Sequence, residues 1–477
     1  MARSFGFGGV KLDVDAGRQA LAEEEPVRLG PDPDDPFRIL ILGDFSGRGS
    51  GTGKPIEVDR DNLDEVLRSL QVQAELKLGS SSVYRLGFEA LGDFEPDRVV
   101  DRSELFRRLE GATPAEKGSA RRAEKLEHQV DMAKLASGSL LDAILGEEEA
   151  SRKQDIPARQ SQDELRAIIN RATEPYLERK PGAREKKRAA DREQGMSLLL
   201  RAILHEPKFQ RLEAAWRSLD FLVRGLETDE LLKVYIFDIS KEKLTADLLE
   251  SADFRSSNTY RVIVEDSVRT PGAQPWALLV GNYSFDRKVE GDVELLGSLG
   301  LLARAARAPF LAECLPSESA ANSSESWPAL RESACANWIG LALPRFLLRL
   351  PYGKETVPTE RFAFEEMPGT PEHGKYLWGN PAFVCAHLLG TSFSEMRWEF
   401  RPGLHREIQG LPLHVFRAEG TSRAQPCAEI LLTETDCNDL LDEGLMPLAS
   451  VKDRDSVRLV RFQSVADPAA RLSGRWG

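Results

Sequence analysis

Hydrophobic residues form their first regular pattern between residues 36 and 110. Residues 37–42 are a short, mostly apolar run that ends at a glycine, which predicts a buried β-strand. Residues 83–88 alternate as in a second strand, whereas residues 62–70 and 95–109 have the spacing of helices. The pattern therefore predicts a compact α/β unit over residues 36–110.

Residues 1–35 have a different character from the unit that follows them. They are rich in Gly, Pro and Asp, and only residues 5–15 alternate enough to supply one edge strand. The run PDPDDP at 31–36 is typical of a linker. We therefore expect an N-terminal arm over residues 1–35.

Residues 111–195 are rich in charged residues and alanine, and they contain few aromatic residues. Ser139 and Asp142 have the spacing of a capping box, which predicts a short helix that ends at Gly146. Its apolar stripe is formed by Leu140, Leu141, Ile144 and Leu145. Residues 179–192 hold seven basic and two acidic residues with no aromatic residue between them, which favours a solvated linker over a nucleic-acid patch. We expect a charged, helical linker here.

The apolar periodicity returns at Met196 and continues through residue 477. A helix pair is predicted on either side of Pro207. The predicted strands that follow are residues 232–239, 260–264, 276–281 and 338–343, and the predicted helices are residues 244–249 and 293–305. Strands that alternate with helices favour an α/β fold, with mixed sheets and covering helices.

Composition limits the classes of protein to consider. The chain has 477 residues, with 64 basic against 77 acidic ones and a net charge of −13, which disfavours a nucleic-acid or anionic-lipid partner. No apolar run is long enough for a signal peptide or a membrane span, so we expect a cytoplasmic protein without membrane insertion. Five scattered cysteines, without a CxxC pair, predict buried free thiols.

Motifs for catalysis are weak. Gly49–Lys54 suggests a phosphate loop, but Arg48 stands where the motif requires glycine, and Pro55 follows the lysine. A connecting loop is therefore favoured, and an NTP hydrolase remains a remote alternative. The six histidines form no HxxxH pair, and no G-x-S-x-G motif occurs. We expect no catalytic residue, no cofactor and no metal.

Lone acidic residues are the candidate general bases in this sequence. Asp44, Asp93, Glu365 and Glu366 stand in suitable local contexts, but none has an evident partner group in the sequence. Such acids are more often helix caps or surface charges, and we expect that here.

Two sets of strings resemble the two sheath subunits of the bacterial type VI secretion system. The strings that resemble the small subunit are PFRILILGDFSGR (36–48), EVDRDNLDEVL (57–67) and ALGDFEPDRVV (90–100). Those that resemble the large subunit include ILHEPKFQRLEAAWRSLDFLV (203–223), ETDELLKVYIFDISKEKL (227–244), WALLVGNYSFD (276–286), IGLALPRFLLRLPYGKET (339–356), YLWGNPAF (376–383), GLPLHVF (410–416) and GLMPL (444–448).

The resemblance implies a fusion of the small subunit, over residues 36–110, with the large subunit, over residues 196–477. In that family the two subunits associate, polymerise helically around an inner tube and contract to eject it. The implied partners are other sheath subunits, the inner-tube protein, the baseplate and a AAA+ unfoldase that disassembles the sheath. The unfoldase grips a short helix near the start of the large subunit, and residues 139–146 fall at that place.

One departure from the family opens an alternative function. Large subunits continue well past the motif that is here Ala470–Ser473, with strands that clasp neighbouring subunits, whereas this sequence stops at Gly477. We expect either a sheath subunit whose clasp is shortened or supplied by another chain, or a sheath-like adaptor at the baseplate or sheath end that does not polymerise alone.

Overall fold

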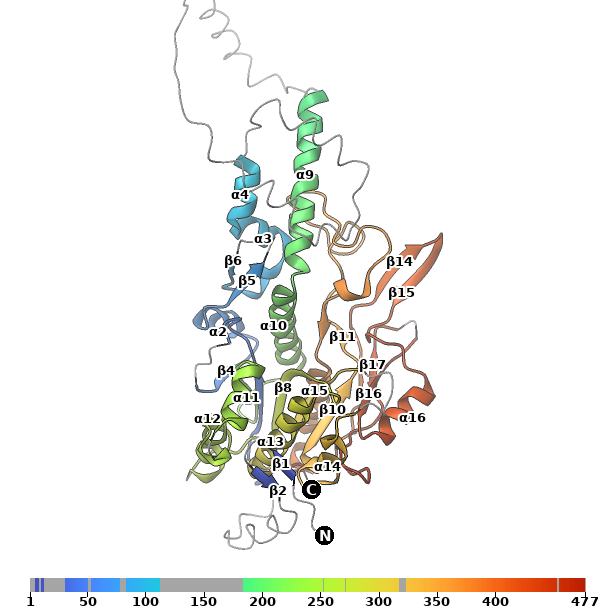
Figure 1. Cartoon of the computed structure of the whole chain (residues 1–477). Helices are drawn as coiled ribbons and strands as arrows, with labels where there is room; N and C mark the ends of the chain where they lie inside the picture. Colours follow the sequence, from blue (N-terminus) through green and yellow to red (C-terminus); the bar gives the residue numbers. More distant parts are fainter. Residues whose placement is uncertain are drawn as a thin grey trace, which may run out of the picture.

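The structure is a computed structural model of the whole chain (Figure 1). It describes residues 5–7, 10–12, 31–49, 53–77, 83–111, 183–251, 253–270, 272–316, 323–452 and 454–476.

A nine-stranded sheet forms the centre of the molecule. Its strands, in their order across the sheet, are β13 (Glu407–Ile408), β17 (Val457–Leu459), β16 (Met446–Ser450), β10 (Ile339–Leu343), β9 (Phe310–Cys314), β8 (Leu278–Phe285), β3 (Phe37–Gly43), β7 (Leu232–Asp238) and β4 (Ile56–Val58). The six strands from β16 to β7 are parallel, whereas β4 and β17 run antiparallel to their neighbours. The expected α/β fold with a mixed sheet is confirmed.

Helices cover both faces of this sheet. One face packs against α10 (Pro207–Gly225) and α15 (Pro381–Met396), and the other packs against α11 (Lys241–Leu249), α13 (Glu290–Ala306) and α14 (Ser326–Glu332). In β3, the odd-numbered Phe37, Ile39 and Ile41 belong to the first core, and the even-numbered Leu40 and Leu42 belong to the second. Burial on both faces explains why the strand is a continuous apolar run.

The segment after β3 forms a small layer beside α10. It contains α2 (Leu63–Ser69), a hairpin of β5 (Gln73–Lys77) and β6 (Val83–Gly87), and then α3 (Pro96–Arg102) and α4 (Glu104–Gly111). Phe88 and Phe94 stack with their ring centroids 4.1 Å apart, and both rings meet Phe209 of α10 edge-on. These aromatic contacts hold the layer against α10.

The predicted helix pair around Pro207 is confirmed. Helix α9 (Ala183–Leu204) extends beyond the body of the molecule, and α10 follows after a two-residue break (Figure 1). The side chain of Glu206 accepts hydrogen bonds from the amides of Lys208 and Phe209 and so caps α10. Proline in the first turn suits this start because its missing N–H is not needed there.

Three predicted elements differ from the structure. Residues 260–264 are helical, not a strand: α12 (Asn258–Tyr260) continues into a wide helical segment, Arg261–Arg269. The carboxylate of Asp247 accepts the amide hydrogens of Asn258 and Thr259, which fixes a helix start that the apolar run alone did not reveal.

The other two differences are interruptions. The helix expected over residues 95–109 is split into α3 and α4 at Ser103, whose backbone is extended. The single strand expected within residues 5–15 is a hairpin of β1 (Phe5–Phe7) and β2 (Val10–Leu12).

Several smaller elements lie beyond the large sheet. β11 (Phe346–Leu347) pairs with β12 (Trp378–Gly379) near α10. The hairpin of β14 (His414–Ala418) and β15 (Thr421–Gln425) projects from the body, and α16 (Glu434–Asp442) follows it in the chain (Figure 1). Side chains on β15 are mostly exposed, whereas β14 is buried at both of its ends, His414 and Ala418.

Candidate assembly site

The glycine-containing loop after β3 lies at the carboxyl edge of the parallel strands, where related folds bind phosphate. Four backbone N–H groups in the described part of this loop already have carboxylate acceptors. One oxygen of Asp238 accepts from the amides of Phe45 and Ser46, at 2.8 and 3.0 Å. One oxygen of Asp44 accepts from Gly47 and Gly49, at 2.9 and 3.1 Å. Over residues 45–49, the chain's own carboxylates therefore occupy backbone donors that a phosphate group would need.

The segment after this loop also differs from a phosphate-binding loop. Lys54 is followed by Pro55 and then by the edge strand β4, and not by a helix.

The other candidate acids also hold the fold together. Asp93 accepts hydrogen bonds from the amides of Glu89 and Ala90 and pairs with Arg102. Glu365 accepts the amide hydrogen of Lys354. Asp93 thus caps a short helix and Glu365 is an exposed charge, as expected, whereas the expectation of a cap or a surface charge is wrong for Glu366, which is buried.

Glu366 belongs to a buried ionic cluster that ties residues 349–366 to α10. Arg349 lies between two carboxylates, with its nitrogens 2.8 Å from Glu213 and 2.8 Å from Glu366. Arg217 also bonds Glu213, and it donates to the hydroxyl of Tyr352. Burial raises the pKa of Glu366, but Arg349 and the hydrogen bonds outweigh it and lower that pKa to about 2.

A second buried cluster lies at the end of β9. Glu313 accepts a hydrogen bond from Ser284 at 2.7 Å and lies 3.7 Å from Arg345. Arg345 makes a two-pronged contact with Glu429. Burial raises the pKa of Glu313 to about 7, because Arg345 and Ser284 compensate for it only in part.

Cysteine and histidine chemistry gives no reactive centre in the part of the chain that the structure describes. All five cysteines are free and buried, as predicted, and burial raises the pKa of Cys314 and Cys385 to about 12. No three His, Cys, Asp or Glu side chains among the described residues are placed to hold a metal ion. Among these same residues, no helix is both long and apolar enough to cross a membrane.

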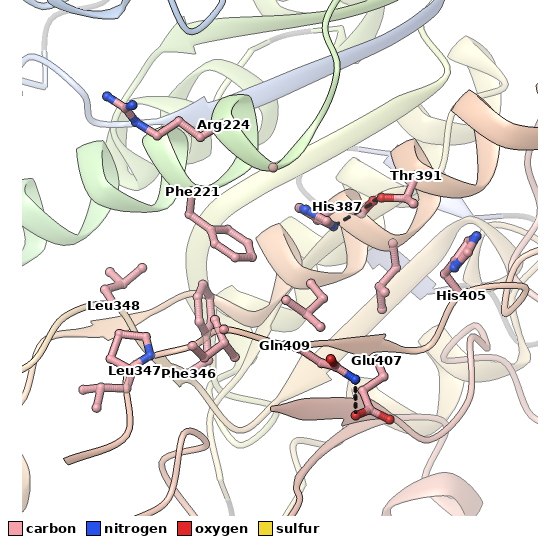
Figure 2. A pocket seen from close by; sticks show the side chains of 16 residues that line it. Phe221, Arg224, Phe346, Leu347, Leu348, His387, Thr391, His405, Glu407 and Gln409 are labelled. Atoms are coloured by element: carbon pink, nitrogen blue, oxygen red, sulfur yellow. Dashed lines mark hydrogen bonds between the residues drawn. The ribbon is translucent and has the colours of Figure 1, made fainter. Parts of the chain in front are cut away.

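A pocket of about 660 Å³ opens between α10, β11, α15 and the segment that contains β13 (Figure 2). Phe221 meets Phe346 with ring centroids 5.1 Å apart, and it stacks on His387 at 5.4 Å. Burial lowers the pKa of His387 to about 4, so its ring is neutral at neutral pH. Ile408 and Leu411 add apolar walls.

Apolar side chains are also exposed near α16. Ile430 and Leu431 are 37% and 57% exposed, and they directly precede this helix. Thr433 and Asp436 form a capping box that fixes the helix start. The described surface thus contains a pocket and two exposed apolar residues before α16. The ionic clusters, by contrast, are largely buried and their charged groups are paired.

Sequence reasoning did not find the pocket, whose lining comes from segments that lie far apart in the chain. The proposed unfoldase helix, with Leu140, Leu141, Ile144 and Leu145, lies outside the described residues. The Thr433 capping box is a signal that the sequence does contain.

Two family models match the chain. The VipB model, described as EvpB tail sheath N-terminal domain, matches residues 187–319 and 315–466, which together exceed half of the chain. The model of the type VI secretion system protein VipA matches residues 33–118. This chain belongs to the type VI secretion sheath family.

A curated relative agrees with this membership. The chain is 35% identical over 291 residues to the type VI secretion system sheath protein TssC1 of Pseudomonas aeruginosa. The match covers 56% of this chain and 58% of TssC1, so the chain spans somewhat more than half the length of that relative.

The regions matched by the two sheath models share one sheet. β3, from the VipA-matched region, pairs along seven residues with β7 and along four with β8, both from the VipB-matched region. The indole N–H of Trp216 donates to the carbonyl of Phe45 at 2.9 Å across the same seam. The carboxylate of Asp97 accepts the amide hydrogens of Glu360 and Arg361.

Proposed function

We propose that the chain is a structural subunit of a type VI secretion sheath, in which small- and large-subunit-like parts act as one covalently joined unit. Copies pack into a helical lattice around an inner tube in the cytoplasm, and rearrangement of that lattice ejects the tube. The observation that carries the proposal is the position of β3, a strand from the VipA-matched region, between two strands from the VipB-matched region.

The physical requirements of such a device fit these contacts. Contraction needs two packings of the same subunits that differ in free energy, and it needs no bond-making centre. A subunit that transmits force between copies must keep its own parts together. The shared sheet and the buried Arg349 cluster provide that cohesion.

The NTP-hydrolase alternative is disfavoured because amide donors of the glycine-containing loop already have acceptors within the chain. The carboxylates of Asp44 and Asp238 accept hydrogen bonds from backbone amides of this loop. A nucleotide phosphate would have to replace these carboxylates as the acceptor. The same two carboxylates would repel a phosphate group.

Electron microscopy tests the proposed function. The purified chain, alone and mixed with full-length sheath subunits, is expected to form regular tubes or to enter tubes made by those subunits. Tubes from the chain alone would exclude the adaptor function. Decoration of tube ends only would favour the adaptor, and absence from every tube would contradict both.

The partners beyond the sheath are part of the same proposal. An inner-tube protein, a baseplate and a AAA+ unfoldase follow from a contractile sheath, and residues 139–146 are the proposed grip of the unfoldase.

A further inference from the structure

Two clusters of this chain place one arginine between two buried carboxylates, and they differ in their balance of charge. In the first cluster, Arg349 contacts Glu213 and Glu366. Arg217 bonds the same Glu213, so two guanidinium groups face two carboxylates. The backbone N–H of Tyr352 also donates to Glu366. The arginine and carboxylate charges of this cluster therefore cancel when both carboxylates are ionised.

The second cluster, the Arg345 cluster, lacks one cation. Arg345 makes a two-pronged contact with Glu429 and lies 3.7 Å from Glu313. The side chains of Glu313 and Glu429 are only 5% and 6% exposed. The hydroxyl of Ser284 donates to Glu313 but brings no charge. With both carboxylates ionised, one buried negative charge is left uncompensated, which is costly, and a proton on Glu313 removes it.

No other side chain in the described part of the chain supplies the missing cation. The charged groups that act on Glu313 are Arg345, Glu429 and Lys241. Lys241 is already paired with Asp292, at 2.7 Å. The strands on either side of β9, which are β8 and β10, carry no charged side chain. A proton is therefore the group that balances the Arg345 cluster.

The Arg345 cluster holds the segment that leads into α16. The N–H of Glu429 donates to the carbonyl of Arg345 at 2.8 Å, and the N–H of Leu347 donates to the carbonyl of Cys427 at 2.7 Å. Glu429 directly precedes the two exposed apolar residues before α16. A change in the contact between Arg345 and Glu429 therefore changes how firmly this segment is held.

We propose that the Arg345 cluster is a pH-sensitive switch for residues 427–429. With a proton on Glu313, Arg345 belongs to Glu429 alone, and the segment is held against residues 345–347. Once Glu313 is ionised, the two carboxylates compete for one guanidinium group and repel each other, so the segment opens more often. The switch goes beyond the sheath function and does not depend on it, because all its groups lie within one copy.

The burial of Glu313 fixes the direction of the pH effect. Its pKa is about 7 when the segment is closed, against an ordinary value of 4.5, so the closed form binds the proton more tightly than the open form. The closed form is therefore favoured at low pH, and the hold weakens as pH rises from about 4.5 through 7. One proton changes the opening equilibrium by at most about tenfold for each pH unit.

Hydrogen exchange of the full chain at several pH values between 5 and 7.5 tests the switch. After correction for the intrinsic pH dependence of amide exchange, the protection of the Glu429 and Leu347 amides is expected to fall about tenfold across this range. Glu313→Gln stays neutral at every pH, so its protection should stay constant. The amide of Tyr352, bonded to Glu366 in the charge-balanced cluster, is the internal control and should keep its protection.

Two further variants identify the group that binds the proton. Glu429→Gln removes the competing carboxylate, so Arg345 serves Glu313 alone and the pH dependence should be lost; this variant decides the test even if Glu313→Gln fails to fold. His373→Gln removes the imidazole that lies 3.5 Å from Glu429, and it should keep the wild-type dependence. Constant protection in the wild type, an unchanged dependence in Glu313→Gln or Glu429→Gln, a lost dependence in His373→Gln, or an equal fall at Tyr352 would each overturn the switch.

Discussion

The surroundings of β3, where the VipA-matched and VipB-matched regions meet, differ from the surface around α16 in how far their polar groups are paired and their apolar groups are buried. At the seam, β3 has a strand on both sides, and its apolar residues are buried on both faces. Around α16, apolar residues are exposed and acidic residues have no basic neighbour on their own helix. The groups of the first region are paired or buried within one copy, whereas those of the second face solvent.

The difference also appears in the ion pairs. The side chain of Arg349 is 10% exposed and its two partner carboxylates are fully buried, whereas the pair of Arg85 and Glu75 on the β5–β6 hairpin is largely exposed. Removal of one partner from a buried pair leaves an uncompensated charge, whereas an exposed pair is replaced by water. The two regions should therefore respond very differently to the same type of substitution.

The largest effect is expected for Arg349→Met. The change leaves Glu213 and Glu366 buried without their shared cation, which should lower the free energy of unfolding by about 3–5 kcal/mol. Arg85→Met, the control, should cost less than about 1 kcal/mol. Urea unfolding measures both, and equal losses would contradict the assignment of Arg349 to the internal framework.

The next effect concerns Glu313 and pH. Its pKa of about 7 in the folded state exceeds the ordinary value of 4.5, so its contribution to stability is lost as pH rises from about 4.5 through 7. Glu313→Gln removes this dependence. The variant should gain about 1–3 kcal/mol relative to the wild type between pH 5 and pH 8.

Thermal unfolding at several pH values measures this gain, and Glu434→Gln on the exposed face of α16 is the control. A constant difference between Glu313→Gln and the wild type at every pH would contradict the proposed role of burial.

A smaller effect is expected at the start of α16. Thr433→Ala removes the oxygen that accepts the amide hydrogen of Asp436. The loss should lower the free energy of unfolding by about 1 kcal/mol and loosen the adjacent residues Ile430 and Leu431. Thr435→Ala lies inside the same helix and should cost nothing, because alanine is the better helix former. Chemical unfolding and sedimentation compare the two variants. Equal free energies of unfolding would contradict a stabilising role of the capping box.

The smallest effect on stability is expected in residues 139–146. Leu141→Asp combined with Ile144→Asp should change the free energy of unfolding by less than about 0.5 kcal/mol. It should nevertheless abolish binding to the cognate AAA+ unfoldase in a pull-down assay. Unchanged binding would remove this segment as the proposed grip.

Much of the fold could be predicted from the sequence, because β3, β7, α10 and α13 have strong apolar patterns. α15 was missed because it is buried almost all round and has no polar face to mark its period. Residues 260–264 were assigned wrongly because consecutive buried residues look alike in a strand and in an enclosed helix.

The candidate site was harder to predict for a different reason. The pocket brings together Phe221, Phe346, His387 and Ile408, which no sequence spacing connects. The start of α16 could have been predicted, because the apolar run 430–432 is followed by Thr433 and Asp436 at the spacing of a capping box. Local sequence signals thus predict helix starts, whereas cavities depend on the tertiary arrangement of distant segments.

We expect the two sheath-like parts to behave as one mechanical unit because they share one sheet. A specific protease site inserted after residue 150 allows the purified, folded chain to be cut between β3 and β7, and size-exclusion chromatography with light scattering then reports the mass. Both fragments are expected to elute together at the mass of the intact chain, because β3 stays paired between β7 and β8. Two separate peaks at the masses of the fragments would contradict it.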